Sequence, residues 1–196
     1  IASGAKFKKL NIKGEAEFMG RGVSYCATCD GPFFRNKEIA VIGGGNSALQ
    51  EALYLTRFAG KVNLIHRRDE FRAVKILQER VLKDPKINVI LSATVEEIEG
   101  SESIEKIRIK NIKNGQTNEL SVSGVFIFVG WTPNTKFLTE SKIVLNEDGY
   151  ILTNDEMQTS IPGVFACGDI RKKLLRQVVT AAGDGATASV AAQHYI

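Results

Sequence analysis

The chain has 196 residues, 26 of them lysine or arginine and 22 aspartate or glutamate, which gives a formal net charge of +4. Hydrophobic residues make up 43% and charged residues 24%, a composition that excludes disordered, collagen-like and coiled-coil proteins. The small basic excess is spread along the chain and argues against a nucleic-acid surface, and the longest purely apolar stretch, residues 125–129, is far shorter than the roughly 20 residues that cross a bilayer.

The first 20 residues are interrupted by glycines and predict a short strand at most. Residues 26–32 are dense in turn formers. Residues 38–42 form an apolar, β-branched run that predicts a buried strand, and after a glycine-rich turn residues 48–56 repeat apolar side chains at helical spacing. With the next predicted strand at 61–65, these segments make one strand–helix–strand unit.

Gly60 stands where the cap at the end of the first helix is expected. A second helix is predicted over residues 72–83, because apolar residues there share one helical face and Pro85 lies just beyond the end. Residues 87–91 predict a third parallel strand. The face that the second helix is expected to bury consists of Val74, Leu77 and Val81.

The hydrophobic pattern then changes, and apolar and polar residues alternate at 94–100, 103–110 and 117–122. The Asn-Gly pair at 114–115 is a strong hairpin signal, so an antiparallel excursion is expected before the chain returns to the core as a strand at 125–129. Little helix is expected after that, until a closing helix begins near Gln177. The sequence therefore predicts an α/β fold with a parallel sheet.

The glycine-rich turn has the pattern Gly43-x-Gly45-x-x-Ala48 and joins a predicted strand to a predicted helix. In this context the first glycine makes a tight turn, the second lets a pyrophosphate approach the backbone, and the alanine allows close helix packing. Asn46 and Ser47 open the helix, whose free N–H groups attract an anion. The alternative is a plain glycine-rich turn.

The type of dinucleotide is indicated by the end of the second strand, where an NAD site would place an acidic residue. His66, Arg67 and Arg68 stand there instead, with Arg72 one helical turn on. Guanidinium groups suit a 2′-phosphate, so the expected cofactor is NADPH. His66 is expected to touch the phosphate, with a packing role as the alternative, and a solvated basic patch is the alternative for the arginines.

Three cysteines are too few for a disulfide scaffold. Cys26 and Cys29 form a Cys-x-x-Cys pair, and Asp30 follows at once, where a carboxylate can relay protons during thiol–disulfide exchange. The alternatives are two inert thiols or half of a zinc site, but the further ligands that zinc needs are missing, so no metal site is expected. Cys167 is expected to be a buried core thiol.

The motifs in their order resemble those of the low-molecular-weight bacterial thioredoxin reductases. The first three are Cys-Ala-Thr-Cys-Asp-Gly at 26–31, Gly-Gly-Gly-Asn-Ser-Ala at 43–48 and His-Arg-Arg-x-x-x-Arg-Ala at 66–73. The resemblance continues through residues 124–135, which look like the family's exit from its NADPH domain. It ends with two segments that look like the family's flavin motifs, at 159–169 and 176–185.

The resemblance implies an NADPH-dependent thioredoxin-disulfide reductase, in which hydride passes from NADPH through FAD to the Cys26–Cys29 disulfide and on to thioredoxin. Cys29 would face the flavin, Cys26 would attack the partner's disulfide, and Asp30 would be the acid and base. The residues that would contact FAD are Gly168, Asp169, Arg176, Gln177 and Val178.

The resemblance also implies two domains. A Rossmann-like NAD(P)-binding domain with the redox cysteines would cover 12–135, and segments 1–11 and 136–196 would be remnants of a second, FAD-binding α/β domain. Such an enzyme has two glycine fingerprints, and this chain carries one. Together with its start at Ile1 instead of Met, this predicts a fragment that lacks the FAD-binding half and is inactive alone.

Thioredoxin or a thioredoxin-like protein is the expected partner, and neither nucleic acid nor a membrane is. The resemblance implies a homodimer at full length, and the absence of a signal pattern in residues 1–6 predicts a cytoplasmic location. Two alternatives stay open: a non-catalytic NADPH-binding module, and a related flavoprotein that reduces a peroxidase or another thioredoxin-like partner.

Overall fold

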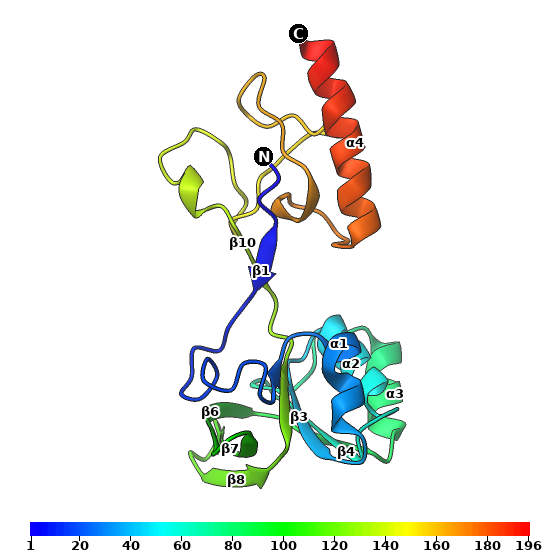
Figure 1. The fold of residues 1–196 in the computed structure, drawn as a ribbon, viewed down its shortest axis with the longest axis vertical. Helices are drawn as coiled ribbons and strands as arrows, with labels where there is room; N and C mark the ends of the chain where they lie inside the picture. Colours follow the sequence, from blue (N-terminus) through cyan, green and yellow to red (C-terminus); the bar gives the residue numbers. More distant parts are fainter. The chain divides into compact units, whose positions relative to one another are not determined.

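The computed structural model describes all 196 residues, which divide into two compact units (Figure 1). The larger unit is Lys8–Val129, and the smaller one combines Ile1–Phe7 with Gly130–Ile196. These limits differ by a few residues from the expected ones at 12 and 135. The reason is that strand β1 (Ala5–Phe7) pairs antiparallel with β10 (Trp131–Pro133), which makes both strands part of the smaller unit.

A five-stranded parallel sheet forms the centre of the larger unit. The predicted strands at 38–42 and 61–65 are confirmed residue for residue, whereas the edge strand β2 was not foreseen. Its two residues adopt strand geometry because they pair with Val125 and Phe126, which lie far away in sequence. In spatial order the strands are β2 (Val23–Ser24), β9 (Gly124–Ile127), β3 (Glu38–Ile42), β4 (Lys61–Ile65) and β5 (Ile87–Ile90).

The parallel sheet is buried on both faces, because alternate residues of its strands point to opposite sides. On one side Val41 and its neighbours pack against helices α2 (Asn46–Leu55) and α3 (Lys75–Lys83). On the other side Ala40 and Ile42 pack against an antiparallel sheet. The larger unit thus has three layers, and the expected α/β class is confirmed (Figure 1).

The antiparallel sheet corresponds to the predicted excursion. Its strands, in order, are β6 (Ala93–Gly100), β7 (Ile104–Asn111) and β8 (Thr117–Ser121). The turn between the last two holds the predicted Asn-Gly pair, and Gly115 has a φ of +74°, a conformation that favours glycine.

Three details of the predicted helices are wrong. Helix α2 ends at Leu55, and Gly60 is no cap: an added Cβ there would lie 3.0 Å from the carbonyl oxygen of Asn36, so close backbone approach explains the glycine. Helix α3 begins at Lys75 instead of residue 72. Val74 therefore precedes the helix and is half exposed, and the buried face consists of Leu77 and Val81.

The smaller unit has a small apolar core and little regular structure. Besides β1 and β10 it contains the short 3₁₀ turns η2 (Lys136–Leu138) and η3 (Gly168–Ile170) and the long helix α4 (Val178–Tyr195). No residue of α4 is buried. None of the helices in the structure combines the length and the apolar character that crossing a membrane requires. The core residues are Leu138, Ile151, Ala166 and Ile170.

Candidate redox and dinucleotide-binding site

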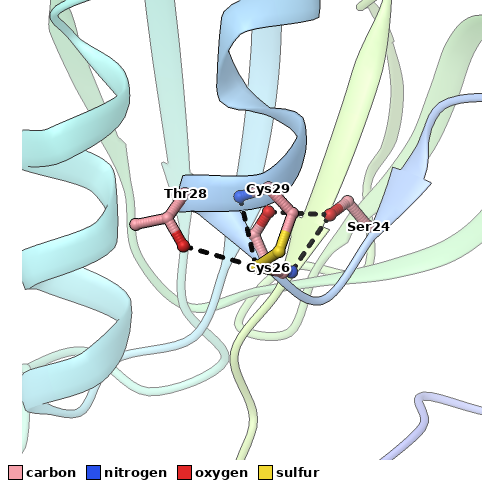
Figure 2. Close-up of a disulfide and its surroundings, with 4 residues drawn as sticks. All are labelled: Ser24, Cys26, Thr28 and Cys29. Carbon is pink, nitrogen blue, oxygen red and sulfur yellow. Dashed lines mark hydrogen bonds between the residues drawn. A yellow bond between two sulfur atoms is a disulfide. The ribbon is translucent and has the colours of Figure 1, made fainter.

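The two cysteines of the Cys-x-x-Cys pair are joined by a disulfide (Figure 2). Cys26 is the N-cap residue of the one-turn helix α1 (Ala27–Asp30), which brings the Cα atoms of Cys26 and Cys29 to 5.3 Å. Cys29 is exposed and Cys26 is half-buried. Of the alternatives weighed from the sequence, the geometry matches the redox pair, since each sulfur is bonded to the other.

Polar groups surround Cys26 more closely than Cys29 (Figure 2). The Ser24 hydroxyl accepts a hydrogen bond from the Cys26 amide at 3.0 Å and donates one to its carbonyl at 3.2 Å. The Cys29 amide donates to Sγ of Cys26 at 3.2 Å, and the Thr28 hydroxyl lies 3.4 Å from the same sulfur. Negative charge that develops on this sulfur when the disulfide opens has donors already in place.

Asp30, the last residue of α1, lines a groove beside the disulfide loop. The groove has a volume of about 530 Å³, and its walls include Arg21, Ser24 and the highly exposed ring of Phe33. Asp30 is therefore accessible from a concave surface that also carries a cation and an aromatic ring.

Sequence reasoning missed a buried carboxylate that supports the disulfide loop. Glu15 is 3% exposed and accepts hydrogen bonds from the amides of Leu10 and Asn11, at 2.9 and 2.6 Å. It also accepts one from the hydroxyl of Tyr25, the residue directly before Cys26, at 2.7 Å. Burial, the hydrogen bond and the charge of Glu15 raise the pKa of Tyr25. No sequence signal marks this glutamate, because its partners become neighbours only in the folded chain.

The three glycines between β3 and α2 have different surroundings. Gly43 has a φ of +149°, and an added Cβ would lie 2.4 Å from the carbonyl oxygen of Phe128 and 2.7 Å from Cβ of Ala48. At Gly44, the variable position of the Gly-x-Gly pattern, an added Cβ would lie 2.3 Å from the His66 ring. At Gly45, by contrast, a Cβ would meet nothing within 4 Å. Gly45 therefore leaves open space at the N-terminus of α2, where a pyrophosphate can approach the backbone.

The other residues of the fingerprint have separate places. Ala48 is fully buried and packs against the turn, whereas Asn46 and Ser47 are exposed in the first turn of α2. The first N–H groups of such a helix have no partners within it and fit an anion. The Asn46 side chain accepts a hydrogen bond from the Val74 amide at 2.8 Å, so it also anchors the start of α3.

The arginines that follow β4 line one cavity. Its volume is about 490 Å³, and Arg67, Arg68 and Arg72 all contribute to its wall. The Arg72 amide donates to the Gly44 carbonyl at 2.8 Å, which ties this cavity to the glycine-rich turn. Three guanidinium groups around one cavity next to a helix N-terminus fit the phosphates of a dinucleotide with a 2′-phosphate.

His66, an expected phosphate contact, packs beneath this turn and does not line the arginine cavity. It is 5% exposed, its ring stacks on Phe71 with centroids 5.8 Å apart, and its Nε2 atom has no hydrogen-bond partner. Burial, together with the charges of Arg72, Arg68 and Arg67, lowers the pKa of His66. A neutral imidazole in contact with Gly44 therefore supports the turn from below.

The sheet brings these features to one edge. Strands β2, β3 and β4 run parallel, so their carboxyl ends lie at the same edge of the sheet. Cys26 follows β2, Gly43 follows β3 and His66 follows β4. The disulfide loop, the glycine-rich turn and the arginine cavity are thus parts of one region of the larger unit.

The five residues expected to contact FAD lie in the smaller unit. Asp169 has a buried carboxylate oxygen, and Arg176 a buried Nε atom, that find no partner in the protein. The Arg176 guanidinium lies 4.1 Å from the centre of the Tyr150 ring, while Gln177 and Val178 are exposed at the start of α4. Unsatisfied buried polar atoms are costly, and a polar ligand would satisfy them.

Gly168, the fifth residue expected to contact FAD, is held by Asp184 of helix α4. Its amide donates to the Asp184 carboxylate at 3.0 Å, and its φ of +78° favours glycine. Although burial of Asp184 opposes ionisation, ion pairs with Lys173 and Arg171 hold the pKa of Asp184 below its usual value. The turn before α4 is thus fixed by charge-assisted hydrogen bonds.

Comparison with known proteins agrees with these features. The model of the family "Pyridine nucleotide-disulphide oxidoreductase" matches residues 1–185. The thioredoxin reductases of Treponema pallidum and Bacillus subtilis are 50% and 49% identical to the chain over 196 and 197 residues. The crystal structure of Lactococcus lactis thioredoxin reductase aligns with a TM-score of 0.86 at 50% identity. The resemblance expected from the motifs is confirmed.

The matches cover all of this chain but only part of each relative. The chain spans 63% of the Treponema pallidum protein, 62% of the Bacillus subtilis protein and 64% of the Lactococcus lactis chain. Its relatives thus carry substantial sequence beyond the part that corresponds to this chain.

Proposed function

The chain belongs to the pyridine nucleotide-disulphide oxidoreductase family, and we propose that it forms the NADPH-binding and redox-disulfide part of a thioredoxin reductase. One observation carries the proposal: the Cys26–Cys29 disulfide and the glycine-rich turn of a dinucleotide site lie at the same edge of one parallel sheet. A disulfide and a cofactor site on one rigid scaffold suit an enzyme that reduces the disulfide repeatedly.

NADPH fits the larger unit through this chain's own groups. The open space at Gly45 and the N-terminus of α2 would hold the pyrophosphate, and Arg67, Arg68 and Arg72 would hold the 2′-phosphate. When bound, NADPH together with FAD supplies the two electrons that open the disulfide. The dithiol then carries these electrons to the partner.

The cysteines perform the exchange with thioredoxin. The Cys26 thiolate attacks one sulfur of the partner's disulfide, and the other sulfur leaves as a thiolate and takes up a proton. The Cys29 thiolate then attacks the Cys26 sulfur, which restores the disulfide and releases the reduced partner. The donors around Sγ of Cys26 favour this cysteine as the attacking group, and Asp30 in the adjoining groove provides a carboxylate for the proton transfers.

FAD fits the smaller unit in part. The unpartnered atoms of Asp169 and Arg176 would bind its polar groups, with Gly168, Gln177 and Val178 beside them. The chain contains one glycine fingerprint, at 43–48, so its residues do not provide a second dinucleotide turn for the adenosine half of FAD. We therefore expect the 196-residue chain to bind FAD weakly and not to turn over alone.

The proposal is tested by trapping the partner. A chain with Cys29→Ser and Cys167→Ser keeps only Cys26, and after incubation with oxidised thioredoxin it is expected to form a mixed disulfide visible on a non-reducing gel. The matched chain with Cys26→Ser and Cys167→Ser keeps only Cys29 and is expected to form much less. Equal trapping would overturn the division of roles, and absence of trapping in both would overturn reduction of thioredoxin.

The second candidate is a non-catalytic NADPH-binding module, which the single glycine fingerprint favours. It predicts NADPH binding without any exchange between the dithiol and oxidised thioredoxin, so the trapping experiment separates the two. A flavoprotein that serves a peroxidase would exchange with that partner instead. The leading proposal also includes a cytoplasmic location, because its dithiol must stay reduced, and a homodimer for the longer protein.

A further inference from the structure

The cavity of the three arginines has a second wall that the glycine and arginine motifs do not include. This wall comes from the antiparallel sheet, where the turn between β7 and β8 contributes Ile112 and Lys113, and from Ser92 before β6. All of these residues belong to the larger unit. The side chain of Lys113 adds a fourth cation to a cavity whose carboxylates are Asp69 and Glu70.

Backbone hydrogen bonds fix this wall against the arginines. The Ser92 amide donates to the Arg68 carbonyl at 2.9 Å, and the Ile112 amide donates to the Ser92 carbonyl at 2.7 Å. Ser92 adopts a φ of +52°, a conformation that non-glycine residues adopt only when their surroundings hold them there. The β7–β8 turn is therefore tied to the arginine loop through a continuous chain of bonds.

The backbone at Lys113 is also ordered. The Asn111 side chain accepts hydrogen bonds from the amides of Lys113 and Asn114, at 2.8 and 3.3 Å. The Lys113 ammonium lies 3.5 Å from the Asp69 carboxylate, and both side chains are about two-thirds exposed. An exposed ion pair of this kind is weak, so a stronger anion can replace the carboxylate.

We propose that Lys113 is a fourth phosphate-binding cation of the NADPH site and helps to select the 2′-phosphate. Asp69 is the counter-ion of Lys113 in the structure, and a doubly charged phosphate held by the arginine forks replaces this carboxylate as the partner of the ammonium. The inference rests on the proposed NADPH site, and it adds to that site a residue from the other sheet.

The test is calorimetric binding of adenosine 2′,5′-bisphosphate and of adenosine 5′-monophosphate to the 196-residue chain at low salt. Lys113→Ala is expected to weaken binding of the bisphosphate about fivefold and to leave the monophosphate unchanged, whereas Lys113→Arg retains the wild-type preference. The matched control is Lys110→Ala, because Lys110 lies near the end of β7, three residues before Lys113, and pairs with Glu96 outside the cavity. Both lysines are exposed, so unchanged thermal unfolding is expected for each variant.

A double-mutant cycle tests whether Asp69 is the counter-ion of Lys113. Asp69→Asn is expected to tighten binding of the bisphosphate in the wild-type chain and to do so much less in the Lys113→Ala chain. If Arg68→Ala weakens the bisphosphate while Lys113→Ala matches Lys110→Ala, the NADPH site holds and the role of Lys113 is overturned. If the wild-type chain does not prefer the bisphosphate at all, the proposed cofactor fails, and the role of Lys113 fails with it.

Discussion

The hydroxyl of Tyr25 donates a hydrogen bond to the buried carboxylate of Glu15 across 2.7 Å. Tyr25 directly precedes Cys26, and Glu15 also binds the amides of Leu10 and Asn11, close to where the chain enters the larger unit. The Glu15 carboxylate thus holds both the segment at Leu10 and Asn11 and the residue next to the redox disulfide. Loss of the tyrosine hydroxyl should loosen the disulfide loop.

Tyr25→Phe is expected to lower the free energy of unfolding by about 1 to 2 kcal/mol, because it leaves a buried carboxylate oxygen with one donor fewer. Tyr54→Phe is the matched control, since no hydrogen bond of the Tyr54 hydroxyl is present in the structure and its ring packs on Phe58. Urea unfolding of both variants measures the difference. Equal losses would show that the Glu15 bond contributes no net stability.

Alanine substitutions at Gly44 and Gly45, the neighbouring glycines of the dinucleotide turn, should affect stability and NADPH binding differently. Gly44→Ala places a Cβ against the His66 ring and is expected to lower the free energy of unfolding by about 1 to 3 kcal/mol. Gly45→Ala meets open space, but Gly45 is the N-cap residue of α2 and alanine is a poor N-cap residue, so the free energy of unfolding should fall by about 1 kcal/mol at most. Its NADPH affinity should nevertheless fall about tenfold, because the methyl group occupies the approach of the pyrophosphate.

Denaturation and NADPH titration of these two alanine variants check the contrast. Normal NADPH binding by a stable Gly45→Ala chain would place the pyrophosphate elsewhere. Full stability of Gly44→Ala would mean that the His66 ring moves aside freely.

The stability of the chain should depend on the protonation of His66. Its folded-state pKa is lowered by burial and by three arginines, so the neutral form is favoured by folding. The resulting stability is fully present above the unfolded-state pKa of about 6.5 and is lost as the pH falls below it, through the folded-state pKa. His66→Gln should flatten the pH dependence of unfolding over this range.

His194, the other histidine, lies exposed near the end of α4 and supplies the control variant His194→Gln. Unfolding free energies are measured between neutral and mildly acidic pH for the wild type and both variants. An unchanged slope in the His66 variant would assign the acid sensitivity to other groups.

The purified 196-residue chain should show no flavin absorbance, and added FAD should not give NADPH-dependent reduction of thioredoxin. The physical reason lies in the proposed sites: Asp169 and Arg176 would bind only part of FAD, and the single glycine turn, which is tied to the arginine cavity, would bind NADPH. Absorbance spectra and an NADPH oxidation assay check this. A purified chain that carries stoichiometric flavin would contradict the assignment.

Local patterns were sufficient where the residues themselves dictate the structure. Strands β3 and β4 were predicted residue for residue, because short β-branched apolar runs between turn formers have few alternatives. The Cys-x-x-Cys pair and the arginines were also singled out from short motifs, and the structure places Cys26 soon after β2 and Arg67 and Arg68 soon after β4, while their roles stay predictions. These features depend on neighbours in sequence.

Features that depend on distant partners were missed. Helix α3 starts later than expected, because the Arg72 amide binds the Gly44 carbonyl and the Val74 amide binds the Asn46 side chain. Strand β10 exists only through its pairing with β1, and the bonds of Glu15 and the place of Lys113 likewise arise from folding. None of these partners is visible in a local pattern.

The division of the chain into two units has a consequence for the order in which its parts fold during synthesis. Lys8–Val129 is continuous, so its sheet can close as soon as β9 has been synthesised. Strand β1 leaves the ribosome before the larger unit but pairs with β10, which is made only after the whole larger unit. Strand β1 must therefore wait for β10 while the larger unit assembles, and its short length limits pairing with wrong partners.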